Sequence, residues 1–199
     1  MIKRYTDGRT DVIALEKTKP GNVCCGDVHT VIYTDEYMLC TVIDGLGSGE
    51  SARRSANIVL ETIKRYHQYP VNDIADKSNQ KLGTERGVVL TIIKIYYDKK
   101  QIAYCNYGNV VFLLRTPDGK LVQPIPRRGY LSGRKSTLNT QYFTFEKDSI
   151  FCLHSDGIRS FKKEKLLSAH ELDDVKTYME RFIEEVADDA TVLIGKIGR

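Results

Sequence analysis

The amino-acid sequence predicts an α+β protein: a four-layer α-β-β-α sandwich of two antiparallel sheets flanked by helices. Apolar runs separated by short turn-forming segments fill the middle of the chain, as antiparallel hairpins do. Amphipathic helical patterns occur before and after this block and do not alternate with strands, which argues against a doubly wound parallel sheet. No repeat, low-complexity tract or flexible linker is present, so we expect one domain over residues 1–199.

The first part of the chain is predicted to form three strands and then two helices. The strand-like apolar runs span residues 11–15, 28–34 and 38–43. A glycine-rich loop over 45–49 leads into a helix over 50–66, whose apolar positions recur with the 3.6-residue period. Pro70 interrupts this pattern, and a second helix is expected over 72–82.

The middle and end of the chain are predicted to form three hairpins, a helix and a last strand. The paired runs are 88–97 with 101–106, 110–115 with 121–123, and 142–145 with 150–154. An amphipathic helix is expected over 172–186, followed by a strand over 191–197. This order of elements suits two stacked antiparallel sheets with helices packed outside them.

Composition and charge exclude several classes of protein. The net charge of +4 comes from basic residues mixed with acidic ones, which does not favour nucleic-acid binding. The N-terminus resembles no signal peptide, and no apolar run reaches the ~20 residues needed to cross a bilayer. Five cysteines without a Cys-x-x-Cys pair predict reduced thiols. We therefore expect a cytoplasmic protein that binds neither nucleic acid nor membrane.

Carboxylates follow the ends of several predicted strands. Asp27 follows Gly26, Asp44 and Asp156 each precede a glycine after an apolar run, and the pair Asp188-Asp189 precedes the last strand. If these strand ends lie at one edge of the sheets, the carboxylates will repel one another unless cations lie between them. Oxygen ligands of this kind suit magnesium or manganese. The spacing therefore predicts a divalent-cation site.

An Asp-Gly pair is also a common turn signal, and the chain contains four of them. Asp118-Gly119 lies between two strand-like runs and is interpreted as a hairpin turn only. Asp7-Gly8 lies in a polar N-terminal stretch and is given no chemical role. Asp44 and Asp156 differ from these because an apolar strand leads directly to each of them.

The order of these motifs resembles that of a known enzyme family. The motifs are Cys25-Gly26-Asp27, then 42–49 with the sequence VIDGLGSG, then His154-Ser155-Asp156-Gly157, then Asp188-Asp189-Ala190-Thr191. They are similar to the motifs of the PPM family of metal-dependent serine/threonine phosphatases, most closely its SpoIIE-like branch. The likeness extends from residue 27 to residue 191, and it implies the α-β-β-α fold and phosphatase activity.

The resemblance also implies a set of metal ligands. Asp44 would bridge two divalent cations, manganese or magnesium, with Asp27 and the Gly45 carbonyl on one of them and Asp156 and Asp188 on the other. The implied chemistry is hydrolysis by metal-activated water held by Asp44, with no protein nucleophile. Gly108-Asn109 and Gly87-Val88-Val89 depart from the family pattern at positions that are not metal ligands. Arg53 and Arg54 could hold a phosphoprotein, but we interpret them as a solvated helix face.

The short chain and the segment 129–133 resemble the stand-alone stress-response phosphatases of this branch. The resemblance implies a monomer whose partners are phosphorylated stressosome proteins of the RsbS/RsbR type, and negative feedback on the sigma-B response. Two alternatives stay open: a non-catalytic binding module with the same fold, and a phosphatase acting on an anti-sigma-factor antagonist.

Other phosphatase and nucleotide-binding interpretations fail on the residues. A calcineurin-like site needs further histidine ligands, and His29 is expected to be an ordinary strand side chain. The segment 47–52 fits G-x-G-x-x-A, but no second strand ending in an acidic residue follows its helix. No cysteine is followed by arginine six positions later, which excludes a cysteine phosphatase of the Cys-x5-Arg type.

Overall fold

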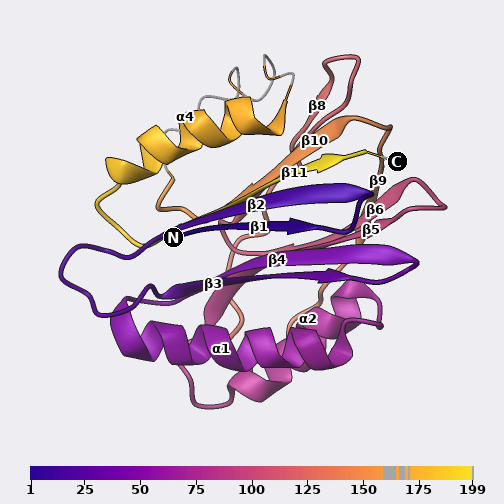
Figure 1. Ribbon diagram of the computed structural model, residues 1–199. Coiled ribbons are helices and arrows are strands. Elements are labelled where there is room, and N and C mark those ends of the chain that lie inside the picture. Colours follow the sequence, from indigo (N-terminus) through magenta and orange to yellow (C-terminus); the bar gives the residue numbers. More distant parts are fainter. Residues whose placement is uncertain (159–164, 166–168, 170, 199) are drawn as a thin grey trace.

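The computed structural model describes residues 1–158, 165, 169 and 171–198, and two antiparallel sheets form its centre (Figure 1). The first sheet has the strand order β1 (Ile2–Thr6), β2 (Thr10–Lys17), β11 (Ala190–Ile197), β10 (Ser149–His154), β7 (Val111–Arg115) and β8 (Leu121–Val122). The second has the order β3 (Asp27–Tyr33), β4 (Tyr37–Gly45), β5 (Val88–Tyr96), β6 (Gln101–Tyr107) and β9 (Gln141–Thr144).

Helices cover the outer face of each sheet, so the layers are α-β-β-α (Figure 1). Helices α1 (Gly49–Tyr66) and α2 (Val71–Leu82) pack on the second sheet, and α4 (Leu172–Glu184) packs on the first. The predicted fold class is therefore confirmed. None of the helices among the described residues is both long enough and apolar enough to span a bilayer.

The core has three apolar layers that match the four structural layers. Between the sheets lie residues such as Cys40, Ile93, Phe112 and Leu153, all fully buried. A second layer lies under α1 and α2, and a third lies under α4. Alternate residues of β4 point to different layers, so this central strand is apolar on both faces. This burial fixes the strands whose ends carry the candidate site.

Two of the three predicted hairpins are present. Strands β5 and β6 pair antiparallel across the turn that follows Tyr97, where Lys100 adopts a positive φ of 47°. Strands β7 and β8 pair across Asp118-Gly119, where the Asp118 carboxylate accepts from the Thr116 hydroxyl and the Lys120 N–H. Asp118 thus acts as a turn residue, as the sequence predicts.

The third predicted hairpin, 142–145 with 150–154, is wrong. Strand β9 pairs with β6 in the second sheet, while β10 lies between β11 and β7 in the first. The connecting residues 145–148 carry the chain from one sheet to the other, with Phe145 buried between them and Asp148 at φ 68°. Adjacent apolar runs joined by a polar turn look alike in sequence whether they pair or change sheets, because pairing depends on distant strands.

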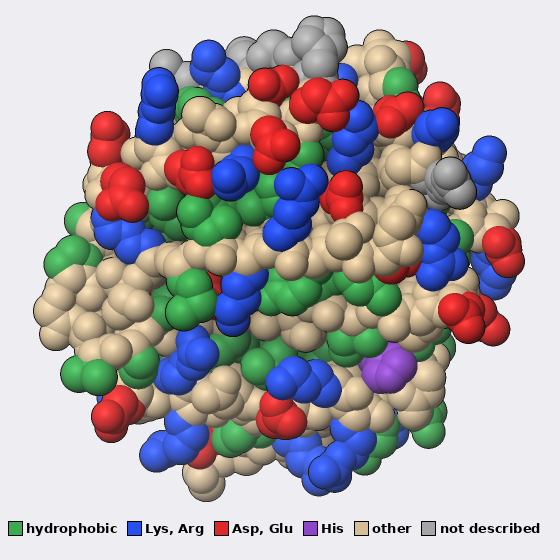
Figure 2. Space-filling view, in the orientation of Figure 1, with side chains coloured by type: hydrophobic (Ala, Val, Ile, Leu, Met, Phe, Trp, Pro, Cys, Tyr) green, Lys and Arg blue, Asp and Glu red, His purple; other side chains and the backbone are tan. Residues whose placement is uncertain are grey.

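Strand β1 was not predicted from the sequence. It is an edge strand with mostly exposed side chains, so it lacks the apolar alternation of a half-buried strand. On the face of the molecule shown in Figure 2, acidic and basic side chains are interspersed over α4 and the neighbouring strands. Arg4 illustrates the mixing, since it lies 3.8 Å from Asp11 and 3.9 Å from Asp173.

Candidate metal centre

The strand register brings the predicted carboxylates together at one end of the two sheets. Asp27 begins β3 and Asp44 lies near the end of β4, and the two are direct partners across the β3–β4 ladder. On the other sheet, Ser155 follows β10 and exchanges two hydrogen bonds with Thr191 of β11: its N–H donates to the Thr191 carbonyl, and its Oγ accepts from the Thr191 N–H, both at 3.0 Å. This clasp holds Asp156 beside the Asp188-Asp189 pair.

Five carboxylates line a single cavity of about 200 Å³ at this end of the molecule. They are Asp27, Asp44, Asp156, Asp188 and Asp189, and the rest of the described wall is Leu46, Gly47, Val89 and Asn109. No basic side chain belongs to the described wall. The cavity therefore gathers negative charge from both sheets, and of its five carboxylates only Asp188 forms an ion pair among the described residues, with Lys19.

Burial makes this gathering of charge costly. Asp27 is 1% exposed, and its Oδ2 atom has no hydrogen-bond partner among the described residues. Desolvation raises the pKa of Asp27 above its usual range. Desolvation, together with the charges of Asp27 and Asp156, likewise raises the pKa of Asp44. Both shifts mean that the groups around these two carboxylates do not offset the cost of ionising them in a buried site.

The donor set fits hydrated divalent cations. Within the described residues, no three His, Cys, Asp or Glu side chains are already gathered into a ready-made single-ion site. The carboxylates instead surround a cavity with room for several water-sized groups. Magnesium keeps several of its waters and is held by one or two carboxylates, so spaced oxygen ligands suit it better than a closed cage. The unpartnered buried oxygen of Asp27 supports the same fit.

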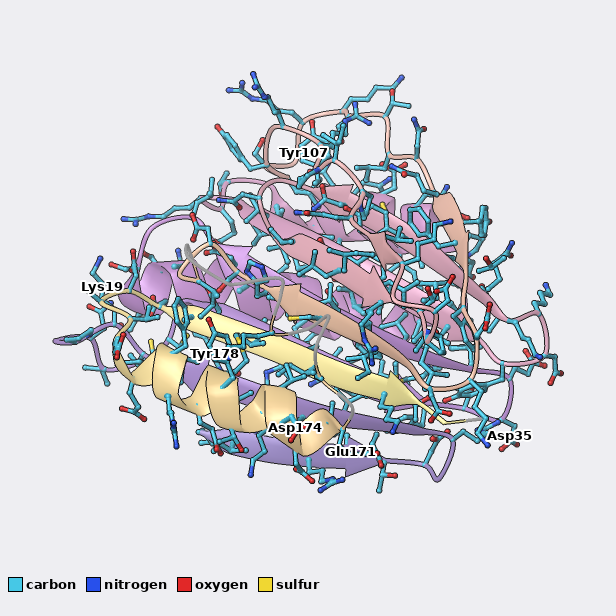
Figure 3. The ribbon with its side chains drawn as sticks, turned by 90° about the horizontal axis from the view of Figure 1, so that it is seen from above. Lys19, Asp35, Tyr107, Glu171, Asp174 and Tyr178 are labelled. Atoms are coloured by element: carbon cyan, nitrogen blue, oxygen red, sulfur yellow. The ribbon has the colours of Figure 1, made fainter. Side chains whose placement is uncertain are left out.

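The two aspartates of the Asp188-Asp189 pair have different surroundings. Asp188 is about half exposed and lies 3.2 Å from the Lys19 ammonium. Asp189 is buried, and its carboxylate accepts from two backbone N–H groups, Lys19 at 2.8 Å and Gly26 at 3.0 Å. The hydrogen bond from Lys19 therefore joins the loop between β2 and β3 to the residue before β11. Figure 3 labels Lys19 on this loop. Asp189 thus ties the loop that ends in Asp27 to the segment before β11 that carries Asp188.

Arg53 holds the backbone of the same loop. Its Nη1 atom donates to the Asp27 carbonyl at 2.7 Å and to the Cys25 carbonyl at 3.3 Å. The interpretation of Arg53 as part of a solvated helix face is therefore wrong, since its guanidinium is engaged with main-chain oxygens. Arg54 does lie on the exposed face, where it pairs with Glu85 at 3.1 Å. The two adjacent arginines point to different sides because neighbouring helical residues lie about 100° apart.

Asn109 is a cavity residue that the sequence interpretation left outside the site. Its Nδ2 atom donates to Asp156 Oδ2 at 2.8 Å, and its side chain lines the cavity. Arg86 does not line the cavity but lies next to its wall, since its Nη1 atom would be 2.7 Å from a Cβ placed on Gly47. The sequence offered one signal for Asn109, because Gly108-Asn109 departs from the family pattern. No feature of the sequence pointed to Arg86.

Two glycines allow close backbone contacts beside the site. A Cβ on Gly45 would meet the Ala52 carbonyl oxygen at 2.1 Å, so only glycine allows α1 to approach the end of β4. A Cβ on Gly157 would meet the Asp189 carbonyl oxygen at 2.1 Å. Gly45 is buried and is not part of the described cavity wall.

His29 lies away from the cavity, between Tyr5 and Glu16, as an ordinary strand side chain.

Comparison with known proteins agrees with this arrangement. Residues 34–197 match the family model of stage II sporulation protein E. The chain is 30% identical over 198 residues to the phosphoserine phosphatase RsbX of Bacillus subtilis (strain 168), covering 99% of this chain and 100% of RsbX. A crystal structure of RsbX in complex with magnesium superposes with a TM-score of 0.95, with full coverage of both chains.

Two more distant structures share the fold. One was solved in work on the bacterial stressosome as a modular system adapted to control secondary messenger signalling; it has 21% identity, a TM-score of 0.83, and coverage of 94% of this chain and 98% of its own. The other is the catalytic domain of the serine/threonine phosphatase PstP with two manganese ions, at 14% identity, a TM-score of 0.70 and coverage of 96% and 99%. The sequence and structural matches together show that this chain belongs to the SpoIIE family of PPM-type metal-dependent protein phosphatases.

Proposed function

We propose that this phosphatase removes phosphate from serine or threonine of stressosome proteins of the RsbS/RsbR type and so damps the sigma-B stress response. The observation that carries the phosphatase chemistry is the single cavity lined by five carboxylates from both sheets. The stressosome setting is supported by the likeness to RsbX over the full chain. A cytoplasmic monomer is also part of the proposal.

The proposed ligands are those expected from the sequence. Asp27 and the Gly45 carbonyl would hold one divalent cation, manganese or magnesium, Asp156 and Asp188 would hold a second, and Asp44 would contribute to both. The ladder pairing of Asp27 with Asp44 supports the first group, and the Ser155–Thr191 clasp supports the second. When bound, divalent cations supply Lewis acidity that lowers the pKa of water and neutralises charge on a phosphoryl group.

The protein's own residues orient and support this chemistry. Arg53 and Asp189 bind main-chain groups of residues 25–27 and so position the Asp27 side chain. The Oδ2 atom of Asp27 itself accepts no hydrogen bond from the described residues. Asn109 orients the Asp156 carboxylate through its amide. Leu46 and Val89 form an apolar part of the wall. No side chain in the described wall is a cysteine, serine or histidine nucleophile, which favours direct hydrolysis.

The first test is hydrolysis of p-nitrophenyl phosphate by the purified protein with manganese, with chelator, and as Asp44→Asn. Turnover should require manganese, and Asp44→Asn should lower kcat at least about 100-fold, as loss of one electrostatic group in an active site does. Asp118→Asn is the matched control, because Asp118 belongs to another Asp-Gly pair that only forms a hairpin turn. Its turnover should equal that of the wild type.

Metal binding measured by calorimetry separates the possible failures. If Asp44→Asn turns over normally, or if turnover ignores the chelator, the assigned site is wrong. If the wild type binds manganese but releases no phosphate from either the aryl phosphate or a phosphoserine peptide, the phosphatase proposal fails. Phosphorylated RsbS/RsbR-type proteins and a phosphorylated anti-sigma-factor antagonist should then be compared as substrates, and faster release from the antagonist would reject the stressosome assignment.

A further inference from the structure

A second cavity, here called the flanking pocket, opens beside the metal cavity. Its volume is about 630 Å³, within the range of sites that bind small molecules or peptide segments. Leu46, Val89 and Asn109 line both cavities, so the two adjoin each other. A phosphorylated residue that reaches the carboxylates would therefore place its neighbours at or in the flanking pocket.

The rest of the flanking pocket is largely apolar. Val111 of β7 forms one side, and Pro126 and Tyr130 form another, on the segment between β8 and β9. Tyr130 is 50% exposed, which leaves its ring available at the surface. The five apolar side chains that line the pocket supply a site for an apolar group, because burying such a group removes its surface from water.

The pocket is held in shape by main-chain contacts. Val88 and Leu131 form an antiparallel bridge, and the Gly108 N–H donates to the Arg127 carbonyl at 2.7 Å. Gly108 and Gly129 adopt positive φ angles of 102° and 118°, and a Cβ on Gly108 would clash with the Val89 side chain at 2.2 Å. These close approaches fix the segment 126–131 against β5 and β6, so the pocket is preformed.

Exposed arginines border the two cavities. Arg128 lines the flanking pocket, and Arg86 lies against Gly47 of the metal cavity. Arg127 differs from them, since its guanidinium stacks over Tyr107 at 5.2 Å and donates to the Thr137 carbonyl. Figure 3 labels Tyr107 on the other side of the molecule from α4. Guanidinium groups beside an apolar pocket suit a phosphorylated peptide, which carries negative charge next to its side chains.

We propose that the flanking pocket binds an apolar side chain adjacent to the phosphorylated serine or threonine, and so sets the local sequence preference of the enzyme. The inference rests on the proposed phosphatase function. It adds the substrate class: phosphoprotein segments with an aliphatic residue next to the phosphorylated one. The lining residues shared with the metal cavity, the apolar wall and the bordering arginines together favour a segment of the substrate over any other occupant.

The test compares two phosphoserine peptides that differ only beside the phosphoserine, with leucine on both sides in one and aspartate in the other. The manganese-loaded wild type should hydrolyse the leucine peptide with kcat/KM at least about 10-fold higher, the discrimination that an apolar pocket gives. Tyr130→Lys places a cation in the pocket wall, so the leucine-to-aspartate ratio should fall to about 1 or below.

Ile125→Lys is the matched control. It adds the same charge to the same segment, but Ile125 is 89% exposed and does not line the pocket, so the ratio should stay at the wild-type value. A wild-type ratio of about 1, or an equal fall in Tyr130→Lys and Ile125→Lys, would overturn the pocket assignment while leaving the phosphatase function intact. Absence of manganese-dependent release from both peptides and from p-nitrophenyl phosphate would overturn the phosphatase function, and the pocket assignment with it.

Discussion

Asp188 and Asp189, directly before β11, have different surroundings and different roles. Asp188 is half exposed and faces Lys19 as well as the cavity, so its charge is available to a cation. Asp189 also reaches the cavity wall, but both of its oxygens accept backbone N–H groups. The resemblance to the family predicts that the first aspartate is the metal ligand, and the hydrogen bonds of the second explain what an acidic side chain does there. Asp189 positions the loop that ends in Asp27.

We expect Asp189→Asn to destabilise the protein and Asp188→Asn to leave its stability nearly unchanged. An asparagine amide can accept only on one atom, so one buried backbone N–H loses its partner, at a cost of about 1–3 kcal/mol. Urea unfolding in the presence of chelator measures this loss without a contribution from metal binding. Asp188→Asn removes the same charge from the same cavity and therefore controls for relief of repulsion. Equal effects of the two substitutions would contradict the positioning role.

At the scale of elements, the β1–β2 hairpin depends on a side chain that was given no role from the sequence. The Asp7 carboxylate accepts from the Arg9 and Thr10 N–H groups at 2.9 and 2.8 Å, and from the Tyr97 hydroxyl at 2.9 Å. Burial alone would raise the pKa of Asp7, but these bonds and the Arg9 guanidinium outweigh it and hold the pKa below its usual range. The turn thus connects the edge of one sheet to the end of β5 in the other.

Asp7→Ala should lower the free energy of unfolding at pH 7 by about 1–3 kcal/mol, because several donors lose their acceptor. The folded-state pKa is lowered, so the stabilisation is complete above the ordinary carboxyl pKa of about 3.9 and is lost as pH falls through the lower folded value. Urea unfolding of wild type and variant between pH 7 and pH 2 should therefore show a difference that shrinks at the acid end. Asp118→Ala, at the exposed β7–β8 turn, should cost less. A pH-independent difference would contradict this account.

At the scale of the whole molecule, the metal cavity joins the two sheets. Asp27 and Asp44 belong to the β3–β4 side, whereas Asp156, Asp188 and Asp189 belong to the β10–β11 side. The apolar layer between the sheets holds these two groups of carboxylates near one another against their mutual repulsion. Cations that bind both groups would remove this repulsion and oppose separation of the sheets.

Manganese should therefore stabilise the folded protein. At a free concentration 100 times Kd, one bound ion adds about 2.7 kcal/mol to the free energy of unfolding. Thermal unfolding with manganese and with chelator should differ by several degrees in Tm for the wild type and for Asp118→Asn. The difference should be much smaller for Asp44→Asn. A full manganese shift in Asp44→Asn would show that the stabilising ions bind elsewhere.

The sequence predicted the carboxylate set more completely than the strand pairing. Asp27, Asp44, Asp156 and Asp188 could be selected because each lies where an apolar run meets a turn, and that local pattern survives in the fold. The pairing of 142–145 with 150–154 was wrong, because which strands become neighbours depends on packing between distant segments. Whether the predicted residues act as ligands stays a prediction until metal binding is measured.

The sequence by itself determined the fold class, the hairpins with strong turn chemistry and the aspartates of the site, because apolar periodicity and turn residues are local properties of the chain. Only the tertiary structure decided that Arg53 turns inward to the Asp27 carbonyl, that Asn109 joins the cavity, and that the flanking pocket opens beside it. These features depend on which residues, far apart in the chain, meet across the two sheets. Contacts of that kind follow from packing, which no short stretch of sequence encodes.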